Sequence, residues 1–136
     1  LQVDGTAASR RAALVVGMRA IHAYEQALSR YLLSGLARIP NLIVYGITDI
    51  DRVSERTPTV GIRLKGYTPH NLAKHLGEQG IFTWNGNFYV MGLTEALGIE
   101  ASGGLLRIGL VHYNTIEEID RLLKALDRLV AIQHTE

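Results

Sequence analysis

Residues 103–122 read GGLLRIGLVHYNTIEEIDRL and contain the pattern that decides the fold. Within 105–112, apolar side chains alternate with Arg107 and Gly109, which is typical of a strand with one buried face. The next residues, 115–118, match a capping box, in which a Thr hydroxyl and a Glu carboxylate satisfy the first backbone donors of a helix. A strand followed by a helix is therefore predicted. The apolar face of the strand carries Leu106, Ile108 and Leu110.

At the other end of the chain, one long helix is predicted from about Ser9 to Ile39, and Pro40 and Asn41 end it. Its apolar side chains recur at three- and four-residue steps, which places them on one face. A helix of this length spans a small domain and could project beyond it, but we expect this face to pack in the core. It consists of Leu14, Met18, Ile21, Tyr24, Leu28, Leu32, Leu36 and Ile39.

Two strands are predicted next, at Leu42–Ile47 and Pro58–Lys65. The polar segment between them contains Asp49 and Asp51, which we interpret as a solvated turn rather than a cation site. A second helix is expected to begin at Pro69, because proline fits the first helical position.

The segment from 81 to 98 has two interpretations. Ile81–Trp84 resembles a strand, and Asn85-Gly86 is a strong turn signal that would close a hairpin with Phe88–Met91. Alternatively, the chain turns there and starts a short helix over Val90–Leu97. Under either interpretation the order of elements predicts an α+β fold, in which helices cover one face of a small, mostly antiparallel sheet preceded by a long N-terminal helix.

Composition limits the function classes. The 136 residues are 47% hydrophobic and 20% charged, and their net charge is +1, which fits one globular domain. The basic excess typical of nucleic-acid binders is missing, so nucleic acid is not an expected partner. Apolar runs such as Ala12–Met18 are too short to span a membrane, and we expect a cytoplasmic protein.

Complete catalytic motifs are absent from the sequence. The five histidines lack the spacing of metal ligands, and no P-loop, dinucleotide fingerprint or Gly-x-Ser-x-Gly elbow occurs. We therefore expect neither a catalytic residue nor a metal site in this chain. Arg107 is the candidate binding residue, because a guanidinium on a rigid strand suits bidentate recognition of a carboxylate. The alternatives for this side chain are an exposed strand arginine without a binding role and a structural ion pair.

The run Arg-x-x-x-x-His-Tyr-Asn-Thr-x-Glu-Glu-x-Asp over 107–120 resembles the C-terminal signature of class V aminotransferases. These are pyridoxal-phosphate enzymes of fold type I, and the cysteine desulfurase-like branch is the most similar. The segments RTPTVGI at 56–62 and GIFTWNGNFY at 80–89 follow the expected order. The resemblance thus covers nearly the whole chain.

The resemblance implies that residues 1–136 are the small C-terminal domain of a longer enzyme, with 1–40 as a connecting helix and 41–136 as the sheet and helices. It implies that a large domain of the same polypeptide holds pyridoxal phosphate. It also implies that the substrate is an amino acid and that the enzyme is a homodimer. The Schiff-base lysine of the family belongs to that large domain. The lysines of this chain stand in no matching context: Lys65, Lys74 and Lys124.

Arg107 aligns with the arginine that pairs with the substrate α-carboxylate in this family. Counted from Gly86, the desulfurase cysteine falls at Tyr89, which forms no persulfide, and a second substrate-contacting arginine falls at Trp84. We therefore expect transamination, racemisation or a lyase reaction rather than desulfuration. The residues expected to shape the substrate entrance are Asn87, Phe88 and Tyr89, with packing of the turn as the alternative for each.

A different class of function remains as an alternative. The chain would then be a stand-alone domain that binds a small molecule or assembles with itself. The predicted α+β architecture suits regulatory domains of that kind.

Overall fold

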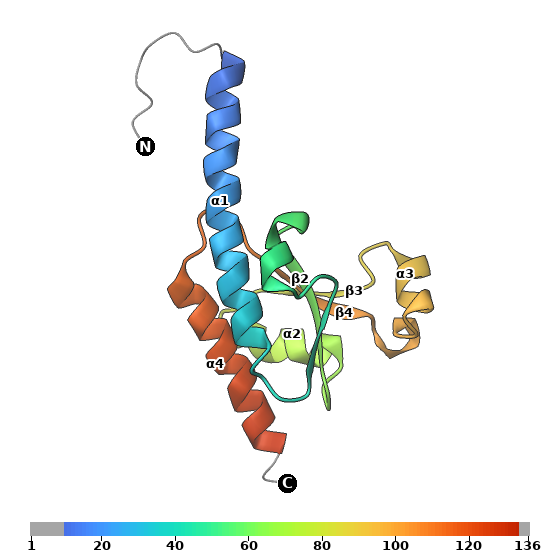
Figure 1. Ribbon diagram of the computed structural model, residues 1–136. Helices are drawn as coiled ribbons and strands as arrows, with labels where there is room; N and C mark the ends of the chain where they lie inside the picture. Colours follow the sequence, from blue (N-terminus) through green and yellow to red (C-terminus); the bar gives the residue numbers. More distant parts are fainter. Residues whose placement is uncertain (1–9, 134–136) are drawn as a thin grey trace.

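The computed structural model describes residues 10–133, which form four strands with helices between and around them (Figure 1). The elements in chain order are α1 Arg10–Leu36, β1 Leu42–Tyr45, η1 Ile50–Glu55, β2 Thr59–Leu64, α2 Pro69–Gly77, β3 Trp84–Gly86, α3 Met91–Ala96, η2 Glu100–Ser102, β4 Leu105–Gly109 and α4 Ile116–Gln133, where η denotes a 3-10 helix.

The strands form one antiparallel sheet in the order β1-β2-β4-β3. α1, α2 and α4 lie on one side of it, while α3 lies beyond the edge formed by β3 (Figure 1). The predicted α+β class is therefore confirmed. The opposite face of the sheet is open, and Ile43 in β1 and Trp84 in β3 are 56% and 67% exposed there.

The core lies between the sheet and the three helices. The alternating aliphatic residues of β2 and β4 point into it, as predicted, and Val60, Ile62 and Leu106 have no exposed surface. α4 contributes the stripe that includes Leu126, and α2 contributes Leu72 and other residues. This packing fixes which side of β4 faces solvent.

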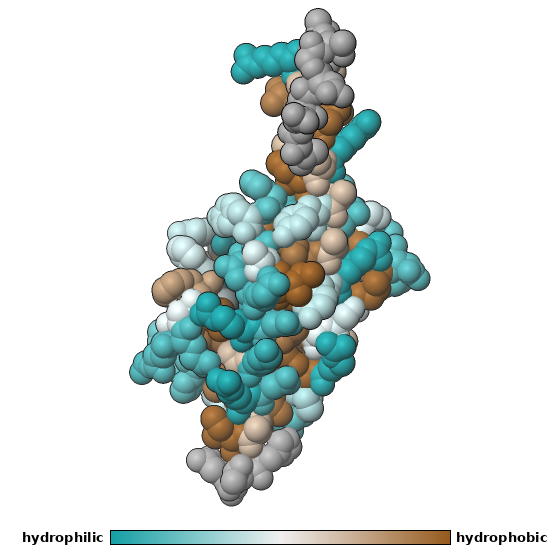
Figure 2. All heavy atoms as spheres, turned by 90° about the vertical axis from the view of Figure 1, so that its left-hand side faces the viewer, coloured by the Kyte–Doolittle hydropathy of each residue, from teal (hydrophilic) through white to brown (hydrophobic). Residues whose placement is uncertain are grey.

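The two halves of α1 differ. From Leu28 to Leu36 the predicted apolar face is buried in the core, as expected. In the first half the expectation of core packing is wrong, because Leu14 and Met18 are 60% and 61% exposed. This half projects beyond the body of the domain, and Figure 2 shows hydrophobic side chains on its surface. None of the helices within residues 10–133 has the length and apolar character to cross a membrane.

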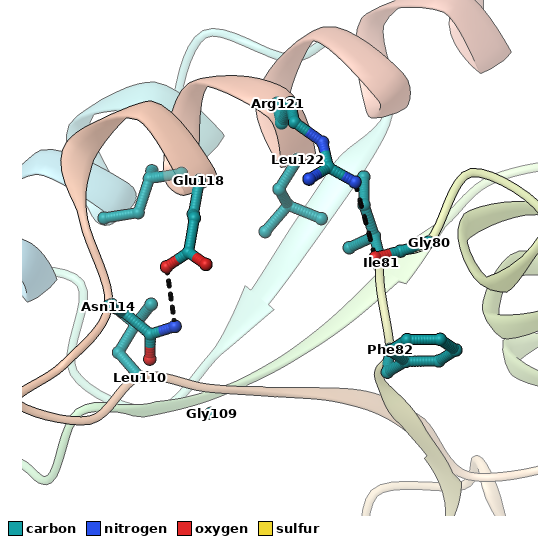
Figure 3. A pocket seen from close by; sticks show the side chains of 10 residues that line it. Gly80, Ile81, Phe82, Gly109, Leu110, Asn114, Glu118, Arg121 and Leu122 are labelled. Atoms are coloured by element: carbon teal, nitrogen blue, oxygen red, sulfur yellow. Dashed lines mark hydrogen bonds between the residues drawn. The ribbon is translucent and has the colours of Figure 1, made fainter.

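The start of α4 follows the predicted capping box. The Thr115 backbone N–H donates to the Glu118 carboxylate at 3.0 Å, and the Glu118 N–H donates to the Thr115 hydroxyl at 3.3 Å. Asn114 adds a third contact, donating its amide N–H to the same carboxylate at 2.9 Å (Figure 3). These hydrogen bonds, with that from Asn114 first, lower the pKa of Glu118 below the usual value.

β3 differs from the predicted strand at Ile81–Trp84. It covers Trp84–Gly86 instead and pairs with β4, so the hairpin with Phe88–Met91 does not form. The alternative of a short helix is confirmed by α3. The position of β3 depends on a contact with a distant part of the sequence. The backbones of Gly86 and Gly104 approach so closely that a Cβ added to Gly104 would lie 2.3 Å from the carbonyl oxygen of Gly86.

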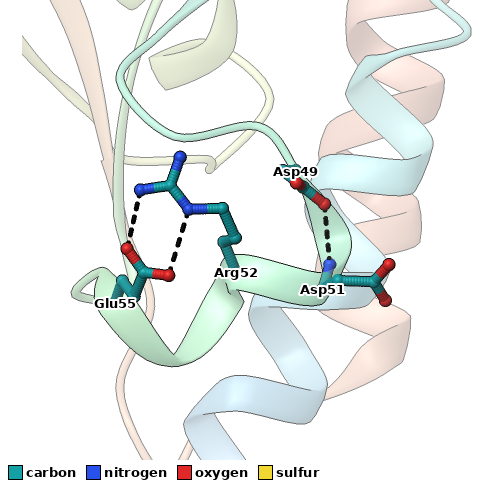
Figure 4. Close-up of polar contacts among 4 residues, drawn as sticks. All are labelled: Asp49, Asp51, Arg52 and Glu55. Carbon is teal, nitrogen blue, oxygen red and sulfur yellow. Dashed lines mark hydrogen bonds and ion pairs between the residues drawn. The ribbon is translucent and has the colours of Figure 1, made fainter.

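The polar segment between β1 and β2 contains η1 rather than a simple turn. Val53 in it is buried, and the Asp49 carboxylate caps it by accepting from the Asp51 N–H at 2.9 Å (Figure 4). Arg52 and Glu55 form an ion pair of 2.7 Å on its outer side. Asp49 therefore has a structural role, which is to cap the N-terminus of η1.

Candidate functional site

Arg107 lies at the middle of β4, hydrogen-bonded between β2 and β3. It is directly opposite Gly61 on one side and Trp84 on the other. Because Leu106 and Ile108 point into the core, the pleat directs Arg107 to the open face, where its side chain is exposed. The strand-face argument from the sequence thus places this guanidinium as predicted.

A pocket of about 460 Å³ surrounds Arg107 at the edge formed by β3. It brings together Arg107 and the residues that the family resemblance implied for the site, including the two positions that depart from desulfurases. Its lining consists of Trp84, Asn85, Gly86, Asn87, Phe88, Tyr89 and Arg107. Guanidinium, amide and aromatic groups are therefore what this pocket offers to a ligand.

The Arg107 guanidinium has an aromatic neighbour. Its Cζ lies 4.7 Å from the centroid of the Phe88 ring, within the range of a cation–π contact. Among residues 10–133, no carboxylate forms an ion pair with it. The structural ion pair considered for Arg107 is therefore absent from the described part of the chain, and the guanidinium retains its capacity to bind an external anion.

The loop after β3 is fixed by its own hydrogen bonds. The side-chain oxygen of Asn87 accepts from the Tyr89 N–H at 3.1 Å, and its amide N–H donates to Glu100 at 2.9 Å. The buried Thr94 hydroxyl also donates to Glu100. The hydrogen bonds from Thr94 and then Asn87 lower the pKa of the Glu100 carboxyl. Asn87 thus lines the pocket while both ends of its side chain are used within the loop.

Sequence reasoning missed Thr94 and Glu100. They come from α3 and η2, on either side of the turn at Gly98, and no local spacing links them to Asn87. Only the folded structure brings the three side chains together.

The backbone of this loop is strained at its tip. Phe88 and Tyr89 have φ angles of 55° and 63°, in the left-handed region that residues other than glycine seldom adopt. Phe88 is half-buried over Arg107, whereas Tyr89 is fully exposed. Two aromatic side chains are therefore presented in opposite ways by adjacent residues.

A second hollow, of about 240 Å³, lies where α4 meets the segment before β3 (Figure 3). Its polar groups are engaged with one another. Arg121 donates to the carbonyl of Gly80 at 3.3 Å, and Glu118 accepts from Asn114. Because these groups are already paired, this hollow lacks the free cation that distinguishes the pocket at Arg107.

Comparison with known proteins identifies the relationship. Residues 3–122 match the aminotransferase class-V family. The chain belongs to this family. The resemblance inferred from the sequence is thereby confirmed, and the similarity extends over α1, the sheet and the beginning of α4.

Relatives of this chain include an aminotransferase-like protein of Gibberella zeae, 32% identical over 114 residues, which cover 82% of this chain and 28% of the relative. A cysteine desulfurase of Cronobacter sakazakii is 32% identical over 114 residues, covering 84% of this chain and 26% of the relative. The chain thus spans about a quarter of the length of these relatives.

Solved structures show the same fold. The apo cysteine desulfurase of Thermococcus onnurineus superposes with a TM-score of 0.76 and 24% identity, over 85% of this chain and 27% of that one. The cysteine desulfurase CsdA of Escherichia coli gives 0.69 and 22%, over 82% and 25%. At these identities the likeness concerns the fold alone.

The pocket does not fit a pyridoxal-phosphate site by itself. An aldehyde cofactor needs an amine to attach to, and Lys65, Lys74 and Lys124 are not among the residues that line the pocket. What the described residues provide is a cation on a rigid strand with aromatic groups around it.

Proposed function

We propose that this chain is the small domain of a larger pyridoxal-phosphate enzyme that transforms amino acids, and that Arg107 binds the substrate α-carboxylate. The observation that carries the proposal is the Arg107 guanidinium on the open sheet face, which forms no ion pair with any carboxylate of residues 10–133. Membership of the aminotransferase class-V family supports it. The share of the relatives that the chain covers supports a second, large domain in the same polypeptide.

The role of Arg107 follows from its geometry. Its planar fork donates two parallel hydrogen bonds to a carboxylate, which fixes both the position and the orientation of the amino acid. β4 is held by partner strands on both sides, so the guanidinium is carried by a rigid element. Orienting the substrate in this way places the Cα bond that is to be broken in the geometry that the reaction requires.

The large domain would hold the cofactor, which supplies an electron sink for chemistry at Cα. Closing the open sheet face against that domain would exclude water from the carboxylate pair and strengthen it. The same proposal includes a homodimer in the cytoplasm and no nucleic-acid partner.

Tyr89 and Trp84 reduce the number of reaction types that fit this chain. The chain contains no cysteine, and Tyr89 has no thiol with which to accept sulfur from a substrate. Trp84 offers bulk and an indole N–H instead of a second guanidinium. Transamination, racemisation or a lyase reaction fits these side chains better than desulfuration by a persulfide.

The test uses the full-length polypeptide that contains this chain. Arg107→Ala is expected to weaken amino-acid binding roughly 10- to 100-fold, as for loss of hydrogen bonds to a charged group. Binding is followed by the change in the visible absorbance of the cofactor as each of a panel of amino acids is added. Arg52→Ala is the matched control, because Arg52 is an exposed arginine on η1.

Unchanged amino-acid affinity in Arg107→Ala, with the cofactor band intact, would refute the assigned role. A naturally expressed polypeptide with neither extra mass nor a visible band that borohydride removes would refute the enzyme itself.

A stand-alone assembly domain is the second candidate, favoured by the exposed apolar first half of α1. Leu14, Val16 and Met18 are each more than half exposed there. An unpartnered apolar helix surface favours association with another protein surface. A colourless protein of 15.0 kDa that self-associates in sedimentation would support this alternative.

A further inference from the structure

We propose that Phe88 is the positioning residue of Arg107, and that Asn87, Thr94 and Glu100 form a clamp that holds Phe88 in place. This inference rests on the proposed binding of a substrate carboxylate by Arg107. It gives the strained loop after β3 a role, which is to present one guanidinium in one orientation before the substrate arrives.

The contact between the two side chains leaves the binding edge of Arg107 free. Phe88 lies against the guanidinium, with 4.7 Å between Cζ and the ring centroid. In the proposal the carboxylate binds along the N–H directions in the guanidinium plane, while the ring contacts the face of that plane. Stacking and carboxylate binding are thus compatible at the same time.

The stacking also lowers the cost of binding. An exposed arginine side chain has considerable rotamer freedom, which it loses when it grips a ligand. Phe88 restricts this freedom in the free protein, because the flat ring selects the rotamers that keep the guanidinium above it. Part of the ordering cost is therefore met during folding and not on substrate binding.

Phe88 reaches this position only because the loop is strained. Its φ of 55° and the φ of 63° at Tyr89 form two consecutive left-handed residues, neither of them glycine. Such conformations persist where the surroundings determine them, and they cluster at functional sites. A loop without a functional role would relax or carry glycine at these positions.

The hydrogen bonds of the clamp stabilise this conformation. The side chain of Asn87 accepts from the Tyr89 N–H and so spans the two strained residues. Its amide is held by Glu100, which the buried Thr94 hydroxyl fixes from the other side. Below them, the Val90 N–H donates to the Asn87 backbone carbonyl at 2.9 Å and closes the turn.

The experiment compares two ligands in the full-length protein. One is an amino acid that binds, and the other is the amine that remains when its carboxylate is removed. Phe88→Leu keeps the bulk but removes the π face, and we expect amino-acid binding to weaken about 3- to 10-fold, as for loss of a cation–π contact. Binding of the amine should not change. Phe88→Tyr should restore wild-type affinity.

Phe82→Leu is the matched control, since Phe82 is 90% exposed and lies outside the lining of the Arg107 pocket. Equal weakening of amino acid and amine in Phe88→Leu would overturn the proposal, because it would indicate a general disturbance of the loop. Unchanged binding of both would overturn it as well. If Arg107→Ala itself fails to weaken the amino acid, the underlying function is wrong, and this result is distinct from either outcome.

The clamp is tested by Glu100→Ala combined with Arg107→Lys. Glu100→Ala alone should give the same carboxylate-selective loss, and in the double variant the two losses should not add, because lysine has no planar fork for the clamp to orient. Glu100→Gln retains acceptor oxygen and should be milder, which provides a folded variant if Glu100→Ala is unstable. Additive losses would overturn the role of the clamp.

Discussion

The two faces of the sheet use the same strands for different purposes. On the helix-covered face, Val60 and Leu106 are completely buried, and their neighbours in the core are aliphatic. On the open face, Ile43 and Trp84 are more than half exposed, and Trp84 lines the pocket at Arg107. The first face therefore holds the fold together, while the second carries the groups of the proposed binding site. Substitutions on the two faces should separate stability from function.

The largest expected effect is on the covered face. Leu106→Ala removes a fully buried side chain and should lower the free energy of unfolding by about 2–5 kcal/mol, because a cavity remains. Ile43→Ala is the matched change on the open face, where Ile43 is 56% exposed, and about 0.5 kcal/mol or less is expected. Urea unfolding of both variants measures the difference. Similar losses would show that the open face is also part of the core.

A smaller effect is expected where the sheet reaches the candidate site. Gly104 has φ of 71°, and an added Cβ would meet the Gly86 backbone at 2.3 Å. Gly104→Ala should therefore destabilise by about 2–3 kcal/mol and displace β3 from β4. Gly109→Ala is the control, since no atom lies within 4 Å of its added Cβ. Unfolding curves measure both changes, and equal stabilities would contradict the close packing of the two backbones.

The same comparison explains what the sequence predicts. Alternation identified both faces of β4, and with them the exposed position of Arg107, because a strand in one sheet has only two sides. The pattern of α1 is as regular around Leu14 as around Leu32, yet only Leu32 is buried. Periodicity states which residues share a face, but not whether a neighbour covers it.

The loop at the site was beyond such reasoning for a different reason. Phe88 stacks on Arg107 across 19 positions of sequence, and Asn87 reaches Glu100 through a fold that brings η2 back to β3. These contacts depend on the pairing of β3 with β4, which local turn signals did not determine. The residues of the pocket were expected from the resemblance, but the contacts that hold them against one another were not predicted.

A further prediction concerns the N-terminal cap of α4, one of the helices on the covered face of the sheet. Thr115→Ala removes the hydroxyl that accepts from the Glu118 N–H and should cost about 1 kcal/mol. Thr115→Ser keeps that hydroxyl and should remain close to wild type. The midpoint of urea unfolding distinguishes the two. Equal stability of the alanine and serine variants would show that the cap contributes nothing to the covered face.

The smallest effect is the pH dependence of the same cap. Hydrogen bonds from Asn114 and the Thr115 N–H lower the pKa of Glu118 in the folded chain, so its carboxylate is favoured by folding. The stabilisation is present above the pKa of the unfolded carboxyl, about 4.3, and is lost as the pH falls through the lower folded value. Glu118→Gln should therefore reduce stability at pH 6 and flatten its decline below pH 4.5.

Urea unfolding at pH 6, 4.5 and 3 measures this slope. The exposed Glu95→Gln, a carboxylate on α3 outside the cap, is the control and should flatten the slope less. Some slope will persist in Glu118→Gln, because the pKa values of Glu55 and Glu117 are also lowered by their hydrogen bonds. If Glu118→Gln and wild type decline in parallel, the cap is held by its neutral hydrogen bonds and not by the carboxylate charge. The charge of Glu118 would then contribute nothing to the helix that covers this face of the sheet.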